Sequence, residues 1–113
     1  MNFTVSGPIT QERAEKAAEW LIHNAEAIAV AKAHKERCEN RLRVVKALAM
    51  KASDEKSAAA QEREAYASTQ YQDAVDELFQ ATLEYEKLIA TRIAAQEVAT
   101  IWRSINANLR GAA

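Results

Sequence analysis

At 113 residues the chain is long enough for one domain at most. It contains two glycines and one proline, all close to the ends, so a glycine-rich phosphate-binding loop is excluded and no strong helix breaker lies between them. The formal net charge of −1 differs from the strongly basic balance of a typical nucleic-acid-binding protein.

The composition favours helix along the whole chain. Alanine is abundant, together with Glu, Lys, Arg and Gln, and these residues lose little side-chain freedom in a helix. β-branched residues nowhere alternate with period two, so a sheet is not expected. We therefore predict an all-α fold, a long antiparallel, coiled-coil-like helical hairpin over residues 10–110 that follows an N-terminal extension over residues 1–9.

The first helix is predicted over about residues 10–51. Thr10 is its expected N-cap, and Gln11 and Glu12 follow in the first turn, where acceptors and negative charge suit the helix dipole. Lys35 occupies a position where the buried stripe of this helix calls for an apolar residue. The expected stripe consists of Ala14, Ala18, Leu21, Ala25, Ile28, Ala31, Cys38, Leu42, Val45 and Ala49.

The turn is predicted over about residues 52–57, where Ser53 and Ser57 are both expected N-caps. The second helix then covers about residues 58–109. Residues 68–70 form the weakest helix-forming stretch of this half, and an alternative with three helices has its break there. The expected buried stripe of the second helix consists of Tyr71, Val75, Leu78, Thr82, Tyr85, Leu88, Ile89, Ala95, Val98 and Ile105.

The second predicted helix is apolar on two sides. A further apolar row lies about 100° around the helix from the first stripe, and a helix with two apolar faces needs two partners. Because the first helix covers only one face, a second copy of the chain is expected to cover the other, so that a homodimer forms a four-helix bundle. The residues of this row are Phe79, Leu83, Ala90, Ile93 and Ile101.

The second helix is predicted to be longer than the first, so residues from about Val98 onward should project beyond the start of the first helix. Phe3, Val5 and Ile9 are expected to fold back over part of this projection, and a partner protein should cover the rest. A Trp-Arg pair is a composition favoured at protein–protein hot spots. The candidate partner-binding residues are Trp102, Arg103, Asn106, Arg110, Phe79, Leu83, Ile93 and Ile101.

Charge is distributed unevenly along the chain. Residues 32–51 carry seven basic and two acidic side chains, whereas residues 53–90 carry three basic and nine acidic ones. A hairpin folded about Ser53 places this basic block opposite residues 56–75, whose acidic side chains neutralise it. The alternative is direct contact with nucleic acid, which the near-neutral net charge does not favour. The candidate nucleic-acid contacts are Lys35, Arg37, Arg41, Arg43 and Lys46, with Arg103 and Arg110 for single-stranded DNA.

The sequence offers little for catalysis or metal binding. His34 and Cys38 are four residues apart and share a helix face, but no third metal ligand accompanies them. A catalytic cysteine normally lies at a helix N-terminus or in a cleft, not in the middle of a long helix. We therefore expect no enzyme activity, no cofactor and no metal site. The single cysteine, the N-terminus without an apolar signal stretch and the lack of a membrane span indicate a cytoplasmic protein.

The chain ends in a distinctive run, Trp-Arg-Ser at residues 102–104 followed by Ala107-Asn108 and Arg110. Together with Tyr71, Ala74, the Tyr-Glu-Lys-Leu run at residues 85–88, Arg92, Ala95 and Ile101, this ending resembles a group of small helical bacteriophage and prophage proteins encoded near recombination or single-strand-annealing genes. The resemblance covers about residues 66–110. It implies a phage origin, a location in the cytoplasm of a bacterial host and an accessory role in phage DNA metabolism, but it supplies no catalytic residues.

These features favour a non-enzymatic phage adaptor that binds a protein of phage or host origin, as an accessory of DNA recombination or replication. Two alternatives remain open. Residues 54–86 are rich in acid and resemble a DNA-mimicking surface, which is typical of inhibitors of host defence nucleases such as anti-CRISPR proteins. The basic residues of the first helix instead favour an accessory that binds single-stranded DNA.

Overall fold

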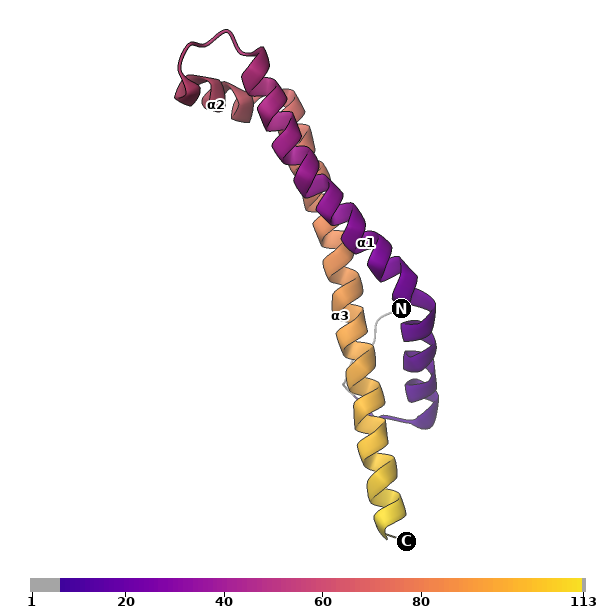
Figure 1. Ribbon diagram of the computed structural model, residues 1–113. Helices are drawn as coiled ribbons and strands as arrows, with labels where there is room; N and C mark the ends of the chain where they lie inside the picture. The colour runs from indigo at the N-terminus through magenta and orange to yellow at the C-terminus, as the bar shows by residue number, and fades with distance from the viewer. Residues whose placement is uncertain (1–6, 113) are drawn as a thin grey trace. The chain divides into compact units, whose positions relative to one another are not determined.

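The computed structural model describes residues 7–112, which form three α-helices and no strand. Figure 1 labels these helices α1 (Gln11–Ala52), α2 (Ala58–Ala67) and α3 (Thr69–Ala112). The predicted all-α class is confirmed. Among the described residues, no helix combines the length and the apolar character needed to cross a membrane. Phe3 and Val5, which were expected to cover part of the second helix, lie outside the described residues.

Hydroxyl side chains mark where the first two helices begin. Thr10 Oγ1 accepts a hydrogen bond from the backbone N–H of Arg13 at 3.2 Å, which caps α1 as predicted. Ser57 Oγ accepts from the backbone N–H of Ala60 at 3.1 Å and caps α2 in the same way. Each cap satisfies a backbone donor that has no partner within its own helix.

Ser53, the other expected N-cap of the turn, caps no helix. Its Oγ accepts from the backbone N–H of Glu55 at 3.1 Å and donates to the Glu64 carboxylate at 2.9 Å. These bonds tie the loop after α1 to α2. The prediction was wrong here because a serine hydroxyl stabilises a tight turn as well as a helix start.

The predicted continuous helix over residues 58–109 is interrupted at Ser68, where the three-helix alternative placed its break. The Ser68 backbone is extended, with φ −69° and ψ 148°. Its Oγ donates to the carbonyl oxygen of Ala65 at 2.7 Å and accepts from the backbone N–H of Tyr71 at 3.2 Å. One side chain therefore ends α2 and caps α3, which offers the backbone an alternative to a continuous helix.

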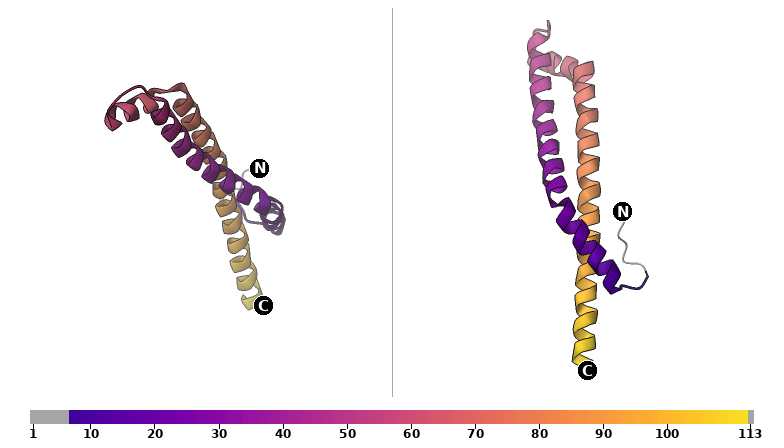
Figure 2. Two further views of the ribbon diagram at one scale, coloured as in Figure 1. Left: turned by 45° about the horizontal axis from the view of Figure 1, so that its top comes forward. Right: turned by 90° about the vertical axis from the view of Figure 1, so that its right-hand side faces the viewer.

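The chain divides into two compact units, and each contains antiparallel segments of α1 and α3. Within the described residues the first unit comprises residues 7–29 and 86–112, and the second comprises Val30–Tyr85. Figure 2 shows the second unit from two more sides, with α2 lying across the end of α1 before α3 returns alongside α1. The two units are described separately below.

Small side chains form the core of the first unit. Ala17, Ala95 and Val98 are fully buried, and Ile9, Trp20 and Leu21 pack against them. The burial of Val98 contradicts the prediction that α3 projects beyond α1 from this residue onward. Residues 106–111 are all exposed instead, and Figures 1 and 2 show the last turns of α3 continuing past the start of α1.

The register of the first unit explains this difference. A hairpin folded about Ser53 would place residue 9 opposite Val98, but the α1 residue buried with Val98 is Ala17, and Ile9, which precedes α1, packs against the same cluster. Residues 58–67 form the separate helix α2 and do not extend the helix that pairs with α1. The pairing therefore shifts along the chain, and the projecting end of α3 is shorter than predicted.

The core of the second unit also consists of small residues. Ala31 and Cys38 of α1, Ala65 of α2, and Ala74 and Ala81 of α3 are all buried. Because the distance between packed helices depends on the side chains at the contact, these small residues allow a close approach of α1 and α3. The helices therefore bury little volume per residue and leave larger apolar side chains on the surface.

Buried and half-buried positions on α1 recur at steps of three and four residues. Ala18 and Ala25, predicted to lie in this row, are exposed, and Ala17 and Asn24 take their places. The Asn24 side-chain amide donates to the backbone oxygen of Trp20 at 2.9 Å, which satisfies a polar group within the row. The observed row consists of Ala14, Ala17, Leu21, Asn24, Ile28, Ala31, Lys35, Cys38, Leu42, Val45 and Ala49.

Candidate protein-binding surface

A groove in the first unit lies between the start of α1 and the last third of α3. Its volume is about 770 Å³. Ala18 and Leu21 of α1 and Ala99 of α3 contribute apolar surface to it, and Trp102 and Arg103 of α3 line it as well. Two of the predicted partner-binding residues, Trp102 and Arg103, therefore belong to a concave surface.

A second hollow of about 450 Å³ lies on α3 in the same unit. It contains Ile93 and Ile101, and it shares Gln96 and Thr100 with the first groove. We call the two hollows together the twin groove. Four predicted partner-binding residues line it, namely Ile93, Ile101, Trp102 and Arg103.

The rim of the twin groove carries charges of both signs. Arg103 Nη2 donates to Thr100 Oγ1 at 3.3 Å, which holds the guanidinium at the α3 side. Glu15, on the α1 side, accepts from the Gln11 side-chain amide at 3.0 Å. Glu97 lines the second hollow. An apolar floor with a rim of mixed charge suits a protein surface better than a uniformly negative phosphate backbone.

The remaining two predicted residues of this region, Asn106 and Arg110, lie beyond the groove and are exposed. They follow Arg103 at steps of three and four residues, so the three side chains form one row along α3. Leu109, beside them, is 63% exposed. We call residues 104–111 the overhang.

Phe79 and Leu83, predicted as part of the same partner-binding set, belong to the second unit and not to the twin groove. Phe79 is 62% exposed, and Leu83 is also exposed. Val75, predicted to be buried, lies one turn before Phe79 and is exposed because the neighbouring Ala74 occupies the core. These three residues form a separate apolar row on α3.

Lys46, a candidate nucleic-acid contact, is occupied by acidic and aromatic neighbours. Its Nζ donates to the Tyr66 hydroxyl at 2.8 Å and to Glu62 Oε1 at 3.1 Å, and the Tyr66 hydroxyl donates to Glu62 at 2.9 Å. The hydrogen bonds to Tyr66 and Glu62 raise the pKa of Lys46. The hydrogen bond from Lys46 holds the pKa of Glu62 below its usual value. This contact matches the expectation that the basic residues of α1 face acidic residues within residues 56–75.

Two more of the candidate cations also contact carboxylates. Arg41 Nε lies 3.7 Å from Glu77, which is outside the predicted facing range because α2 displaces the register. Lys35 Nζ lies 4.0 Å from Glu39 of the same helix. Three of the five candidate nucleic-acid contacts on α1 therefore contact carboxylates within the second unit. The other two are Arg37 and Arg43, both exposed.

The His34–Cys38 pair lies within the second unit. Cys38 Sγ is 3.9 Å from His34 Nε2, and the cysteine is buried. Within residues 7–112 no group of three or more His, Cys, Asp or Glu side chains is arranged to hold a metal ion. Reactive cysteines lie in partly exposed positions, so the burial of this thiol fits a packing role.

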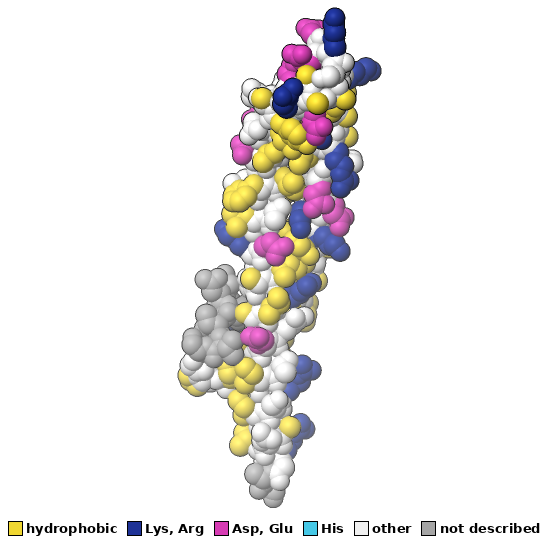
Figure 3. Space-filling view, turned by 90° about the vertical axis from the view of Figure 1, so that its left-hand side faces the viewer, with side chains coloured by type: hydrophobic (Ala, Val, Ile, Leu, Met, Phe, Trp, Pro, Cys, Tyr) yellow, Lys and Arg dark blue, Asp and Glu magenta, His cyan; other side chains and the backbone are white. Residues whose placement is uncertain are grey.

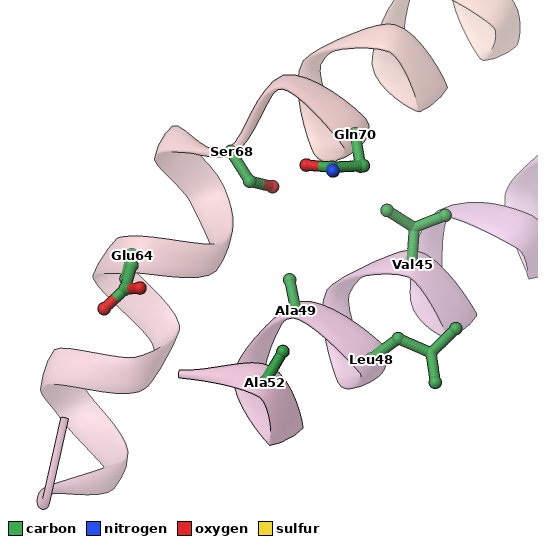
Figure 4. A pocket seen from close by; sticks show the side chains of 7 residues that line it. All are labelled: Val45, Leu48, Ala49, Ala52, Glu64, Ser68 and Gln70. Atoms are coloured by element: carbon green, nitrogen blue, oxygen red, sulfur yellow. The ribbon is translucent and has the colours of Figure 1, made fainter. Parts of the chain in front are cut away.

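The sequence did not predict a pocket of about 360 Å³ at the corner of the second unit. Figure 4 shows Ala49 and Ala52 of α1 below Ser68, with Glu64 and Gln70 from the helices on either side of the break. The pocket lies at the bend of the chain at Ser68, where the end of α1 meets α2 and the start of α3. The weak helical stretch at residues 68–70 was the only sequence signal for it.

No protein-family model, no curated protein and no solved structure matches this chain. Its function is therefore inferred from the surfaces described above and from the resemblance over residues 66–110.

Proposed function

We propose that the chain is a non-enzymatic helical adaptor that binds a protein partner through the twin groove. The observation that carries this proposal is that Trp102 and Arg103 line one hollow of the first unit and Ile93 and Ile101 line the adjoining one, with Gln96 and Thr100 shared between the two. Tryptophan and arginine are enriched at the residues that dominate binding energy in protein interfaces. A groove between two helices suits an amphipathic partner helix, whose apolar face covers the floor while its polar edges meet the charged rim.

The partner is proposed to be a component of the DNA recombination or replication machinery of a phage or of its bacterial host. The support is the resemblance over residues 66–110 to phage proteins encoded near recombination genes. The most specific part of that resemblance starts at Trp102, which also lines the twin groove. One stretch of α3 therefore supplies both the resemblance and the proposed binding surface.

The chain is also proposed to act as a homodimer, in which two coiled-coil-like hairpins form a four-helix bundle. The support is the number of large apolar side chains that stay exposed on both units. Ile22 of the first unit and Val44, Leu48 and Phe79 of the second unit are examples. Packing against a second pair of helices would remove such residues from water, which is the main favourable term in helix association.

Capture from lysates of phage-infected bacteria tests the adaptor proposal. The tagged chain should retain a recombination or replication protein. The Trp102→Ala/Arg103→Ala variant should retain at least about tenfold less of that protein, because it lacks two hot-spot residues. Val30→Ala, at a position of the second unit that is 60% exposed, is the matched control and should bind as the unmodified chain does. Circular dichroism establishes that each variant is helical.

Undiminished capture by a helical double variant would remove the twin groove as the binding site. Fluorescence anisotropy with labelled single- and double-stranded oligonucleotides tests the DNA-binding alternative. Saturable binding that weakens steeply with salt would support that alternative and point to Arg37 and Arg43. Restored phage plaquing on a defended host would support the nuclease-inhibitor alternative instead.

A further inference from the structure

Three arginines share one row along α3 in the first unit. Arg92 and Arg103 are eleven residues apart, and Arg103 and Arg110 are seven apart, which is about three and two helical turns. Steps of three and four residues connect them, and the positions between them on this row are uncharged. We call this row the arginine row, which consists of Arg92, Gln96, Ala99, Arg103, Asn106 and Arg110.

The arginine row contains no acidic residue. Glu86 and Lys87 lie six and five residues before Arg92 and therefore on other faces of α3. Glu97 follows Gln96, so it lies about 100° around the helix from it, and it lines the second hollow. Within residues 7–112, no carboxylate forms a salt bridge with the three arginines of the row. In Figure 3 the described end of α3, at the bottom of the view, shows dark-blue side chains and no magenta ones.

The α1 side of the groove carries the opposite charge. Glu15 lines the groove, and Glu19 follows it by one turn at an exposed position. Neither of these two carboxylates forms a salt bridge with another described residue. Lys16 is paired with Glu12 at 3.1 Å, and Arg13 lies two residues before Glu15, on a different face of α1. The groove is thus acidic along α1 and basic along α3.

Apolar side chains lie between the two charged sides. Ala18 and Leu21 come from α1, and Ala99 and Trp102 come from α3. The groove follows α1 over residues 11–21, which is about 15 Å or three helical turns. A helix that lies in it buries its apolar face on these side chains and turns one edge toward α1 and the other toward α3.

We propose that the partner segment is an amphipathic helix whose two edges have opposite charge, acidic beside α3 and basic beside α1. Carboxylates spaced by about seven and eleven residues then reach the three arginines of the row. A lysine or arginine on the other edge meets Glu15 and Glu19. Charged residues beside an apolar seam set partner choice and orientation in helix pairs. The two sides of the groove therefore also fix the direction in which the partner helix runs.

This inference rests on the proposed function and specifies the chemistry of the partner. Arginines beside a tryptophan also suit a single strand of nucleic acid. The phosphates of such a strand would meet Glu15 and Glu19 on the opposite side of the groove, so a protein with charges of both signs fits better. Arg92 and Arg110 line neither hollow. They therefore report on the charged edge of the partner and not on the filling of the groove.

Three synthetic helical peptides of about 22 residues, or six turns, test this chemistry on the full chain. All three have the same apolar face of leucine and alanine. The mixed peptide carries Glu on one edge and Lys on the other, the basic peptide carries Lys on both edges, and the acidic peptide carries Glu on both. Fluorescence anisotropy at low salt should give the mixed peptide a dissociation constant at least about tenfold lower than those of the other two.

Reversing the charge of the arginine row should change the preferred peptide. Arg92→Glu/Arg110→Glu places carboxylates on the α3 side, so this variant should bind the basic peptide more tightly than the mixed one. Lys32→Glu/Lys51→Glu is the matched control, because it changes the net charge equally at exposed positions of the second unit. The control should bind the mixed peptide as the unmodified chain does.

The α1 side is tested in the same way. Glu15→Lys/Glu19→Lys makes this side of the groove basic and should favour the acidic peptide. Trp102→Ala should weaken binding of the mixed peptide although it changes no charge, because it removes part of the apolar surface of the groove. Circular dichroism establishes that every variant and every peptide is helical.

The outcomes separate this inference from the proposed function. A mixed peptide that binds no more tightly than the other two overturns the inference, as does a preference that Arg92→Glu/Arg110→Glu leaves unchanged. The twin groove itself is tested separately by capture with Trp102→Ala/Arg103→Ala. A single-stranded oligonucleotide that binds the unmodified chain and not Arg92→Glu/Arg110→Glu would assign the arginine row to nucleic acid and overturn the inference. A dimer that the same substitutions dissociate in sedimentation velocity would assign the row to a second copy and overturn it as well.

Discussion

Shortening Val98 to alanine tests the packing of α1 on α3 in the first unit. The Val98 side chain is 0% exposed and packs with Ala17 and Ala95. The substitution removes two methyl groups, and at about 0.8 kcal/mol for each buried carbon the loss is about 1.6 kcal/mol. The cavity that remains adds to this loss, whereas the higher helix propensity of alanine offsets roughly 0.6 kcal/mol. We expect Val98→Ala to lower the free energy of unfolding by about 1–2.5 kcal/mol.

Thermal unfolding followed by circular dichroism, at one fixed protein concentration, measures this effect. A loss of this size corresponds to a fall in Tm of roughly 5–15 °C for a chain of this length. Val30→Ala is the matched control, because it removes the same atoms from a side chain that is 60% exposed. Its Tm should stay unchanged or rise slightly. Equal Tm values for the two variants would refute the described core, because they would mean that Val98 is not packed between α1 and α3.

Two other predictions follow from individual hydrogen bonds. Ser68→Ala should lower the free energy of unfolding by about 1 kcal/mol, because it removes the hydroxyl that caps α3 at the Tyr71 N–H. Ser68→Thr keeps the hydroxyl and should lower the free energy of unfolding by less. Urea denaturation measures both values, and equal losses for the two variants would contradict the capping role. The pKa of Glu62 is lowered in the folded chain by Lys46, so its stabilising contribution is present above the pKa of the unfolded carboxyl and disappears as pH falls through the folded value. Glu62→Gln should therefore be less stable than the unmodified chain near pH 7 and equally stable near pH 3, and a pH-independent difference would count against the contact. The pKa of Lys46 is raised by Tyr66 and Glu62, so the same network should also weaken at alkaline pH as the lysine loses its proton.

The sequence predicted the helical class and the start of α1, but it misplaced parts of the buried row. Ala17 and Ala18 are neighbours, and both fit a pattern of three- and four-residue steps. A methyl side chain gains little from burial and loses little from exposure. In an alanine-rich helix the apolar pattern therefore leaves the phase uncertain by one residue. The polar residues Asn24 and Lys35 within the observed row made the phase harder to predict.

Most of the features that the sequence did not predict depend on the break of the helix at Ser68. Helix propensity alone did not choose between one long helix and two, because a single serine cap stabilises the break by only about 1 kcal/mol. That choice sets the register of α3 on α1, and hence the burial of Val98 and the length of the overhang. It also creates the corner pocket between Ala52 and Ser68.

The sequence predicted residues of the candidate site, but it did not predict which of them lie together in the structure. Trp102 and Arg103 were identified by composition, and the structure places them on one groove together with Leu21 of α1. Phe79 was grouped with them because periodicity on a single helix does not show where one compact unit ends. Likewise, the charges near Lys46 indicated acidic partners, although the partner Glu77 of Arg41 lay outside the expected range.

Site-specific photo-crosslinking tests the central claim, that the twin groove binds a protein, most directly. A photo-reactive amino acid in place of Gln96, which lines both hollows, reports on whatever occupies them. The same probe in place of the exposed Val30 serves as the control. We predict that irradiation of phage-infected cells links position 96, and not position 30, to a protein of DNA recombination or replication. The same set of cross-linked proteins from both positions, or none from position 96, would contradict the claim.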